Sequence, residues 1–238
     1  MAGCGQESES VIEFMKTPEG ISIILCTRNR PESLRKTLED ICAAGRKVSG
    51  LEIILVDNGS GDQTRQVYES FEKRIAIKYI LEPMAGQHYA MNTGLDHVGA
   101  SEIVVFMDDD IEIPADWLGK VEKTCERYPE MDIFCGRSRV IWPEGEIPAW
   151  AKRPALNHLA FSVVEGKEED FMMAPEWWPA TPFWVRSRVI SQDVRFYLSW
   201  PINADFVFRL KEKGCRGVCC SAPVVGHRIQ RELLDPEV

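Results

Sequence analysis

Three adjacent aspartates, Asp108, Asp109 and Asp110, come directly after five apolar residues at positions 103–107. A continuous apolar run of this kind predicts a strand that is buried on both faces. Neighbouring carboxylates repel one another, and a fold tolerates them most easily where a divalent cation binds together with a phosphate ligand. Open α/β sheets keep their ligand crevice at the carboxyl ends of the strands. The arrangement favours an enzyme site for a phosphorylated small molecule over a solvated turn that only caps the next helix.

Other polar residues also follow predicted strands. Asp57 ends the apolar run 51–56. It can accept a hydrogen bond from a nucleobase ring N–H, or it can only stabilise its own Asp-Asn-Gly-Ser-Gly turn. The polar turn at residues 27–30 follows the apolar run 21–26. His227 follows the last predicted strand, where a histidine is either a metal ligand or an ordinary packed side chain.

The elements that must position these residues alternate along the chain. Apolar runs predict strands at residues 21–26, 51–56, 75–80, 102–107 and 131–135. Helical spacing predicts helices between them, which begin at Pro31, after Asp62, at Gly86 and at Pro114. Such alternation is typical of the α/β class, with a mostly parallel central sheet flanked by helices.

The pattern changes after residue 140. Residues 142–184 are rich in tryptophan and proline, which predicts a functional loop or lid rather than a simple connection. A strand at residues 183–186, a helix at residues 203–213 and a strand at residues 217–220 follow. We expect a loosely ordered leader at residues 1–20 and a single domain at residues 21–238.

Bulk composition excludes some classes of protein. The 238 residues carry a formal net charge of −9, which disfavours binding to nucleic acid. No apolar run is long enough to predict a transmembrane segment, and residues 1–20 lack the layout of a signal peptide. We therefore expect a cytoplasmic protein, with peripheral contact to the inner face of a membrane left open. The eight cysteines form no C-x-x-C pair, which favours reduced thiols.

Four motifs in order carry a family resemblance. They are I-S-I-I-L-C-T-R-N-R-P, L-E-I-I-L-V-D-N-G-S-G-D, A-G-Q-H-Y-A-M-N-T-G and V-V-F-M-D-D-D. Over residues 21–120 the chain resembles the inverting GT-A glycosyltransferases of family two. The resemblance implies a GT-A fold and sugar transfer from a UDP-, GDP- or dTDP-sugar to a hydroxyl of a glycan, a lipid-linked or a small-molecule acceptor. It divides the domain into a nucleotide-sugar half, residues 21–140, and an acceptor-binding and catalytic half, residues 141–238.

The resemblance also implies roles for individual residues. Metal ligands for Mn²⁺ or Mg²⁺ would be Asp110 and His227. The catalytic base would be Asp205, in a segment similar to the family's E-D … R-L … G helix, although Ala204 replaces the glutamate. A carboxylate there can deprotonate an acceptor hydroxyl, or it can only favour the helix dipole. Contacts to the nucleotide sugar would come from Thr27, Arg28, Arg30, Asp57, Gly86, Asp108 and Asp109; Arg28 stands where the family commonly has an aromatic residue.

Three other functions fit parts of the pattern. A nucleotidyltransferase has a similar nucleotide site but usually carries a Gly-rich loop after the first strand, where this chain has T-R-N-R-P. A phosphoacceptor receiver domain needs acids after the first strand, where Thr27 stands. A protein that binds a nucleotide sugar without transferring it remains open because of Ala204.

Overall fold

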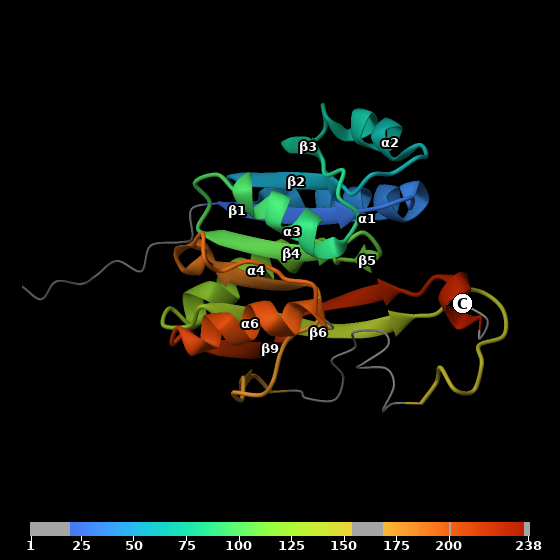
Figure 1. The fold of residues 1–238 in the computed structure, drawn as a ribbon. Helices are drawn as coiled ribbons and strands as arrows, with labels where there is room; N and C mark the ends of the chain where they lie inside the picture. The colour runs from blue at the N-terminus through green and yellow to red at the C-terminus, as the bar shows by residue number, and fades with distance from the viewer. Residues whose placement is uncertain (1–19, 154–168, 200, 236–238) are drawn as a thin grey trace, which may run out of the picture.

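One sheet forms the centre of the molecule (Figure 1). The computed structural model describes residues 20–153, 169–199 and 201–235. The strand order is β3-β2-β1-β4-β8-β6-β9-β5, and β7 pairs with β9. The strands are β1 (Ile21–Thr27), β2 (Leu51–Asp57), β3 (Ile77–Leu81), β4 (Ile103–Asp108), β5 (Ile111–Glu112), β6 (Ile133–Ile141), β7 (Phe171–Met172), β8 (Phe183–Arg186) and β9 (Gly217–Arg228). Residues 1–19 of the expected leader and residues 154–168 of the expected lid lie outside the described residues.

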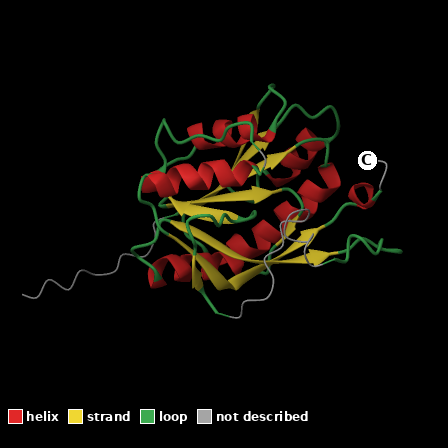
Figure 2. Cartoon of the chain, turned by 60° about the horizontal axis from the view of Figure 1, so that its bottom comes forward, coloured by secondary structure: helices red, strands yellow, loops and turns green. Residues whose placement is uncertain are grey.

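Helices cover both faces of the sheet (Figure 2). The helices are α1 (Pro31–Ala44), α2 (Thr64–Phe71), α3 (Gln87–Asp96), α4 (Trp117–Arg127) and α6 (Ile202–Glu212). One apolar core joins α1, α2 and α4 to one face, and a second core joins α3 and α6 to the other. Because both faces are covered, every residue of β1 is buried, which explains why its sequence is mostly apolar on both faces.

The two halves of the sheet differ in strand direction. The strands β1, β2, β3 and β4 are parallel, as the alternation predicts. In contrast, β8 is antiparallel to both β4 and β6, and β5 and β7 are antiparallel to β9. Because β6 pairs parallel with β9 and both run in the same direction as β4, the mostly parallel sheet that we expected is confirmed, with β5, β7 and β8 reversed. Because β8 is antiparallel to β6, it begins at the edge of the sheet where β6 ends.

The last strand is longer than the predicted segment 217–220. It continues to Arg228 because β6 and β9 shift register between Cys135 and Arg137 and then pair again. Gly136 makes this shift feasible, since a side chain there would begin 2.1 Å from the carbonyl oxygen of Pro223. The extension carries His227 to the carboxyl edge of β4 and β5.

Two further observations concern the predicted compartment and cysteines. None of the helices in the described residues is long and apolar enough to cross a membrane. All seven cysteines in that part of the chain are free thiols, and most of them are buried. Burial raises the pKa of Cys135, which keeps this thiol protonated.

Candidate functional site

A pocket of about 480 Å³ opens at the carboxyl ends of β1, β2 and β4. Parallel pairing brings these ends together, with Thr27 beside Asp57 and Cys26 beside Asp108. The lining residues are Cys26, Thr27, Arg28, Arg30, Asn58, Gly86, Gln87, Ala90, Asp108, Asp109, Asp110, His227 and Leu233. All of the site residues that the sequence predicts line this pocket except Asp57 and Asp205.

The two inner acids of the cluster share one arginine. Asp109 and Asp110 are buried, with 2% and 4% of their surface exposed. Nη1 of Arg30 donates to Oδ1 of Asp109 and to Oδ2 of Asp110, each at 3.2 Å. The hydroxyl of Thr27 donates to Oδ2 of Asp109 at 2.6 Å. Asp109 therefore ties the turn after β1 to the end of β4.

The three carboxylates carry more negative charge than the guanidinium of Arg30, which contacts Asp109 and Asp110, can neutralise. The pKa of Asp109 is raised to about 7, first by burial and then by the neighbouring charge of Asp110. Burial and Asp110 also raise the pKa of Asp108, although its hydrogen bond with Thr181 acts in the opposite direction. Raised carboxyl pKa values show that the ionised forms are destabilised here. A bound cation would reduce the repulsion between the neighbouring carboxylates.

Asp110 and His227 fit a divalent cation. Oδ1 of Asp110 is buried and has no hydrogen-bond partner among the described residues, although Nε2 of His227 lies 3.3 Å away. Adjacent ligands of an octahedral ion are about 3 Å apart when each bond is about 2.1 Å, so this separation suits a shared metal. No group of three or more histidine, cysteine or acidic side chains suited to a metal occurs in the described residues. Phosphate oxygens and water would complete the coordination, as is common for Mg²⁺.

Side chains from α1 and β9 hold the backbone of the acidic turn. Hydroxyl groups of Ser33 and Thr37 donate to the carbonyl of Asp109 at 3.0 and 2.9 Å. The single hydroxyl proton of Thr37 is shared with the carbonyl of Ile111, also 2.9 Å away, and the guanidinium of Arg228 donates to that carbonyl at 2.9 Å. Groups that orient metal ligands in this way usually affect metal affinity strongly. The turn is therefore held in place before any ligand binds.

Asp108 is held by two side chains that the sequence analysis does not identify. Nε2 of Gln87 donates to Oδ1 of Asp108 at 3.0 Å. The hydroxyl of Thr181, a buried residue just before β8, donates to Oδ2. Since each carboxylate oxygen has a second lone pair, both can still accept from a ligand hydroxyl.

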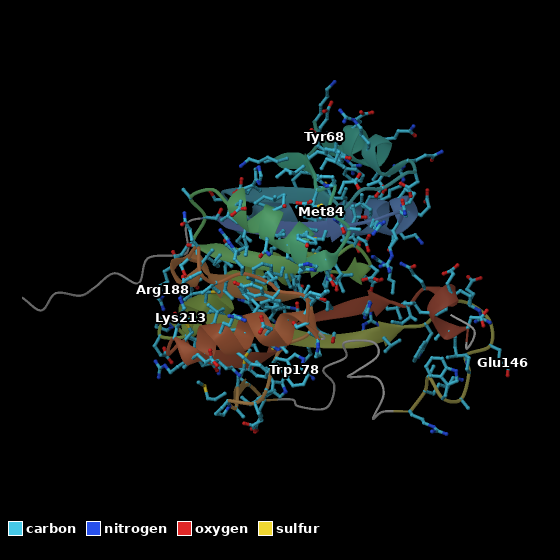
Figure 3. All side chains as sticks on the ribbon, in the orientation of Figure 1. Tyr68, Met84, Glu146, Trp178, Arg188 and Lys213 are labelled. Carbon is cyan, nitrogen blue, oxygen red and sulfur yellow. The ribbon has the colours of Figure 1, made fainter. Side chains whose placement is uncertain are left out.

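The segment that carries Thr181 is itself fixed on α6. Nζ of Lys211 donates to the carbonyl of Ala174 at 2.6 Å. The rings of Trp178 and Phe208 meet edge to face at 5.9 Å, and Figure 3 shows Trp178 beside α6. Residues 174–178 of the predicted lid thus pack on the helix that carries Asp205, whereas Trp142, Trp150 and Ala151 pack against Ile229 and Leu234.

Asp57 lies at the end of β2 with 2% of its surface exposed. Its Oδ1 accepts from the backbone N–H of Ser60 at 2.8 Å, and its Oδ2 accepts from the hydroxyl of Tyr79 at 2.6 Å. Burial and the hydrogen bond to Asp57 raise the pKa of Tyr79, so this hydroxyl stays a donor. Both interpretations from the sequence therefore remain: Asp57 stabilises its own turn, and a lone pair on each oxygen is left for a ligand.

Asn58 shapes the rim of the pocket. Its amide nitrogen donates to the carbonyl of Met84 at 2.6 Å, and its amide oxygen accepts from the N–H of Gly86 at 2.8 Å. Gly86 has φ = 142°, a conformation that side chains rarely adopt. A Cβ there would also lie 2.8 Å from the ring of His88. Gly86 therefore contributes to the pocket through its backbone.

Asp205 lies in the first turn of α6, outside the pocket lining. This helix leads into β9, which runs in the same direction as β4, so the first turn of α6 faces the carboxyl edge of the sheet. Oδ2 of Asp205 accepts from Nε of Arg209 at 2.9 Å. The guanidinium of Arg209 lies 4.3 Å from the ring centre of Tyr197, which restrains the pair.

Sequence reasoning missed several lining or supporting residues, among them Asn58, Gln87, Thr181 and Leu233. Asn58 and Gln87 lie beside predicted residues in the same motifs, so their positions were open to detection. Thr181 and Leu233 carry no sequence signal, because a single hydroxyl or an isolated leucine has no pattern. Only the fold brings them to the pocket.

A family model and a curated relative match the chain. The model described as Glycosyl transferase family 2 matches residues 22–183. The GalNAc(5)-diNAcBac-PP-undecaprenol beta-1,3-glucosyltransferase of Campylobacter jejuni is 35% identical over 158 residues, which cover 65% of this chain and 48% of that protein. The matched part of the chain spans less than half the length of the curated relatives.

Two solved structures share the fold. The mannosyltransferase PcManGT from Pyrobaculum calidifontis, in complex with GDP-Man and Mn²⁺, superposes with a TM-score of 0.68 at 19% identity, covering 91% of this chain and 58% of that one. TarS of S. aureus in complex with UDP-GlcNAc superposes with a TM-score of 0.66 at 15% identity, covering 89% and 59%. At these identities the likeness carries the fold, and it confirms the α/β class with a central sheet flanked by helices.

Proposed function

Because the chain belongs to glycosyltransferase family 2 and has the GT-A fold, we propose that it transfers a sugar from a nucleoside-diphosphate donor to a hydroxyl acceptor. The transfer is metal-dependent and inverts the anomeric carbon. The observation that carries this proposal is the pocket at the end of β4. There Asp108 and Asp110 lie beside Arg30 and His227, and one oxygen of Asp110 lacks a hydrogen-bond partner in the described residues.

The donor half of the site supplies the nucleotide contacts. Thr27, Arg28 and Asp57 contact the nucleoside, and Asp108 accepts a hydrogen bond from a ribose hydroxyl. Gly86 lets the backbone approach the donor closely, since no side chain projects from it. Arg30 and Asp109 complete the diphosphate side of the pocket. The support is their common position around one pocket, and for Asp57 its position at the adjacent end of β2.

Asp110 and His227 would hold a divalent cation, Mn²⁺ or Mg²⁺, and the cation would supply positive charge to stabilise the leaving diphosphate. Asp205 accepts the proton of the acceptor hydroxyl. In an inverting reaction the base must act on the face of the sugar opposite the leaving group. Its place at the sheet edge that holds the pocket, but outside the pocket lining, supports this role.

The acceptor and the compartment are also proposals. The Campylobacter jejuni relative is named for a lipid-linked acceptor. We place the reaction in the cytoplasm or at the inner face of a membrane, on a hydroxyl of a lipid-linked or free glycan. Residues 142–184 are our candidate for acceptor recognition, since residues 174–178 of this segment pack on α6, the helix that carries Asp205.

One alternative keeps the pocket but not the reaction. A protein that binds a nucleotide sugar without transferring it would have the same donor contacts, and Ala204 in place of the family's glutamate favours it. This alternative would be supported if the protein bound the donor but transferred the sugar to none of the acceptors tested.

Calorimetric titration with UDP, GDP and dTDP, each with and without Mn²⁺, tests the donor site directly. We expect one nucleotide to bind at least about tenfold more tightly with Mn²⁺ than without it, because a cation held by Asp110 would supply positive charge to the diphosphate. Absence of binding by all three nucleotides would contradict the proposed function.

Thr181→Val is expected to weaken nucleotide binding by about tenfold, because a hydrogen bond to a charged group contributes about 1.5–3 kcal/mol and Asp108 loses a donor that orients it. Thr181→Ser keeps the hydroxyl and is expected to bind like the wild type. Calorimetry of both variants checks this prediction. Equal affinities for the valine and serine variants would show that Thr181 does not orient Asp108.

A further inference from the structure

Arg30 occupies the position from which a cation would neutralise the acids. Its Nη1 lies 3.2 Å from Oδ1 of Asp109 and 3.2 Å from Oδ2 of Asp110. Charge-assisted hydrogen bonds are usually about 2.7–2.9 Å long. Both bonds of Nη1 are longer than this, because one nitrogen donates to two carboxylates. The guanidinium is thus a loosely held counter-ion.

We propose that Arg30 competes with the divalent cation for Asp110 and passes to the diphosphate when the donor binds. The inference rests on the proposed function, because the competing cation and the diphosphate belong to that site. It goes beyond that function by making Arg30 the positioning residue that couples metal binding to donor binding.

The burial of the three side chains allows this movement. The side chain of Arg30 is 38% exposed, whereas those of Asp109 and Asp110 are 3% and 6% exposed. The arginine lies on the solvent side of the cluster and the carboxylates lie on the protein side. The arginine and the two carboxylates line the same pocket. The guanidinium can therefore leave the carboxylates while the acidic turn, held by Ser33 and Thr37, stays in place.

Electrostatics gives the direction of the effect. A cation at Asp110 is repelled by a guanidinium that touches the same carboxylate, so Arg30 lowers the affinity of the nucleotide-free protein for metal. A diphosphate offers several anionic oxygens, and a guanidinium binds such groups with paired hydrogen bonds. When the donor enters, Arg30 gains a better partner and stops opposing the metal. Metal and donor then strengthen each other's binding.

Titration of the full chain with Mn²⁺ in the absence of nucleotide tests the inference, with the loss of the free Mn²⁺ paramagnetic resonance signal as readout. Arg30→Gln is expected to bind Mn²⁺ about five- to tenfold more tightly than the wild type, because the competing charge is removed. In the presence of Mn²⁺, the same variant is expected to bind the nucleoside diphosphate about tenfold more weakly, because the diphosphate loses the guanidinium of Arg30 as a hydrogen-bond donor.

Arg28→Gln is the matched control. Arg28 lines the same pocket, but the described residues show no ion pair between it and the acids. Its substitution removes the same charge, and the Mn²⁺ affinity of the nucleotide-free protein should change by no more than about twofold. Thermal unfolding with and without Mn²⁺ gives a second readout. Added Mn²⁺ should raise the unfolding temperature of Arg30→Gln more than that of the wild type.

The outcomes separate the two proposals. Equal or weaker Mn²⁺ binding by Arg30→Gln would overturn the role of Arg30 and leave the metal site intact. An equal gain in Mn²⁺ affinity by Arg28→Gln would also overturn the role of Arg30, because the loss of any positive charge from the pocket would then have the same effect. If neither the wild type nor the variant binds Mn²⁺, with or without nucleotide, the metal site of the proposed function fails as well.

Discussion

Asp205→Asn is expected to lower the turnover of sugar transfer by about 100- to 10,000-fold, which is the usual contribution of a general base. The amide is nearly the same shape as the carboxylate but cannot accept the proton of the acceptor hydroxyl at neutral pH. Donor affinity should stay within about twofold of the wild type, because Asp205 lies outside the donor pocket. Initial rates and calorimetric donor binding, measured on the same preparation, check both parts.

The stability of the fold should not account for that loss. Asp205 and Arg209 form a half-buried ion pair at positions i and i+4 of α6, and helix-surface pairs of this spacing contribute about 0.3–0.5 kcal/mol. The amide oxygen of asparagine can still accept from Nε of Arg209. Glu212→Gln makes the same chemical change at the exposed C-terminal end of α6 and should leave turnover unchanged. Turnover retained by Asp205→Asn would remove this residue as the base.

Asp110→Ala is expected to weaken nucleotide binding in the presence of Mn²⁺ by about 100-fold or more and to abolish the gain in affinity that Mn²⁺ produces. The reason is the buried Oδ1 atom, which has no hydrogen-bond partner in the described residues and lies 3.3 Å from Nε2 of His227. Without it, His227 alone cannot hold the cation between protein and diphosphate. Nucleotide titrations with and without Mn²⁺ measure the effect.

This substitution has a control that separates metal binding from folding. Asp116→Ala removes an exposed carboxylate just before α4 and should leave the affinity for metal and nucleotide unchanged. The Asp110→Ala protein should also unfold at a temperature close to that of the wild type, because removing one of three neighbouring acids relieves repulsion. If Mn²⁺ still increased the nucleotide affinity of Asp110→Ala as much as that of the wild type, Asp110 would not be a metal ligand.

Local patterns were sufficient to predict most of the donor half. The apolar runs at residues 21–26, 51–56 and 102–107 are strands because each is buried from both sides of the sheet. The helical spacing of Leu34 and Leu38 places both in the core below α1. Parallel strands end at one edge, so the polar residues that follow them had to meet there.

The half of the sheet that contains the reversed strands was harder to predict. The strand β8 has a clear apolar pattern, but nothing in that pattern says that it lies between β4 and β6. The late extension of β9 passes through Pro223, which interrupts the strand pattern, and depends on a register shift opposite Gly136. Such pairings come from contacts between segments far apart in the chain, and they leave no local periodicity.

By itself, therefore, the sequence determined the α/β class, the edge of the sheet that holds the site and the residue types that meet there, because periodicity and strand ends are local properties. Only the tertiary structure decided which partner each acid has. Thr181 reaches Asp108 across 73 residues, Tyr79 contacts Asp57, and Arg30 bridges Asp109 and Asp110. The physical reason is that a carboxylate's partners depend on distances between elements, which the packing of the whole sheet sets.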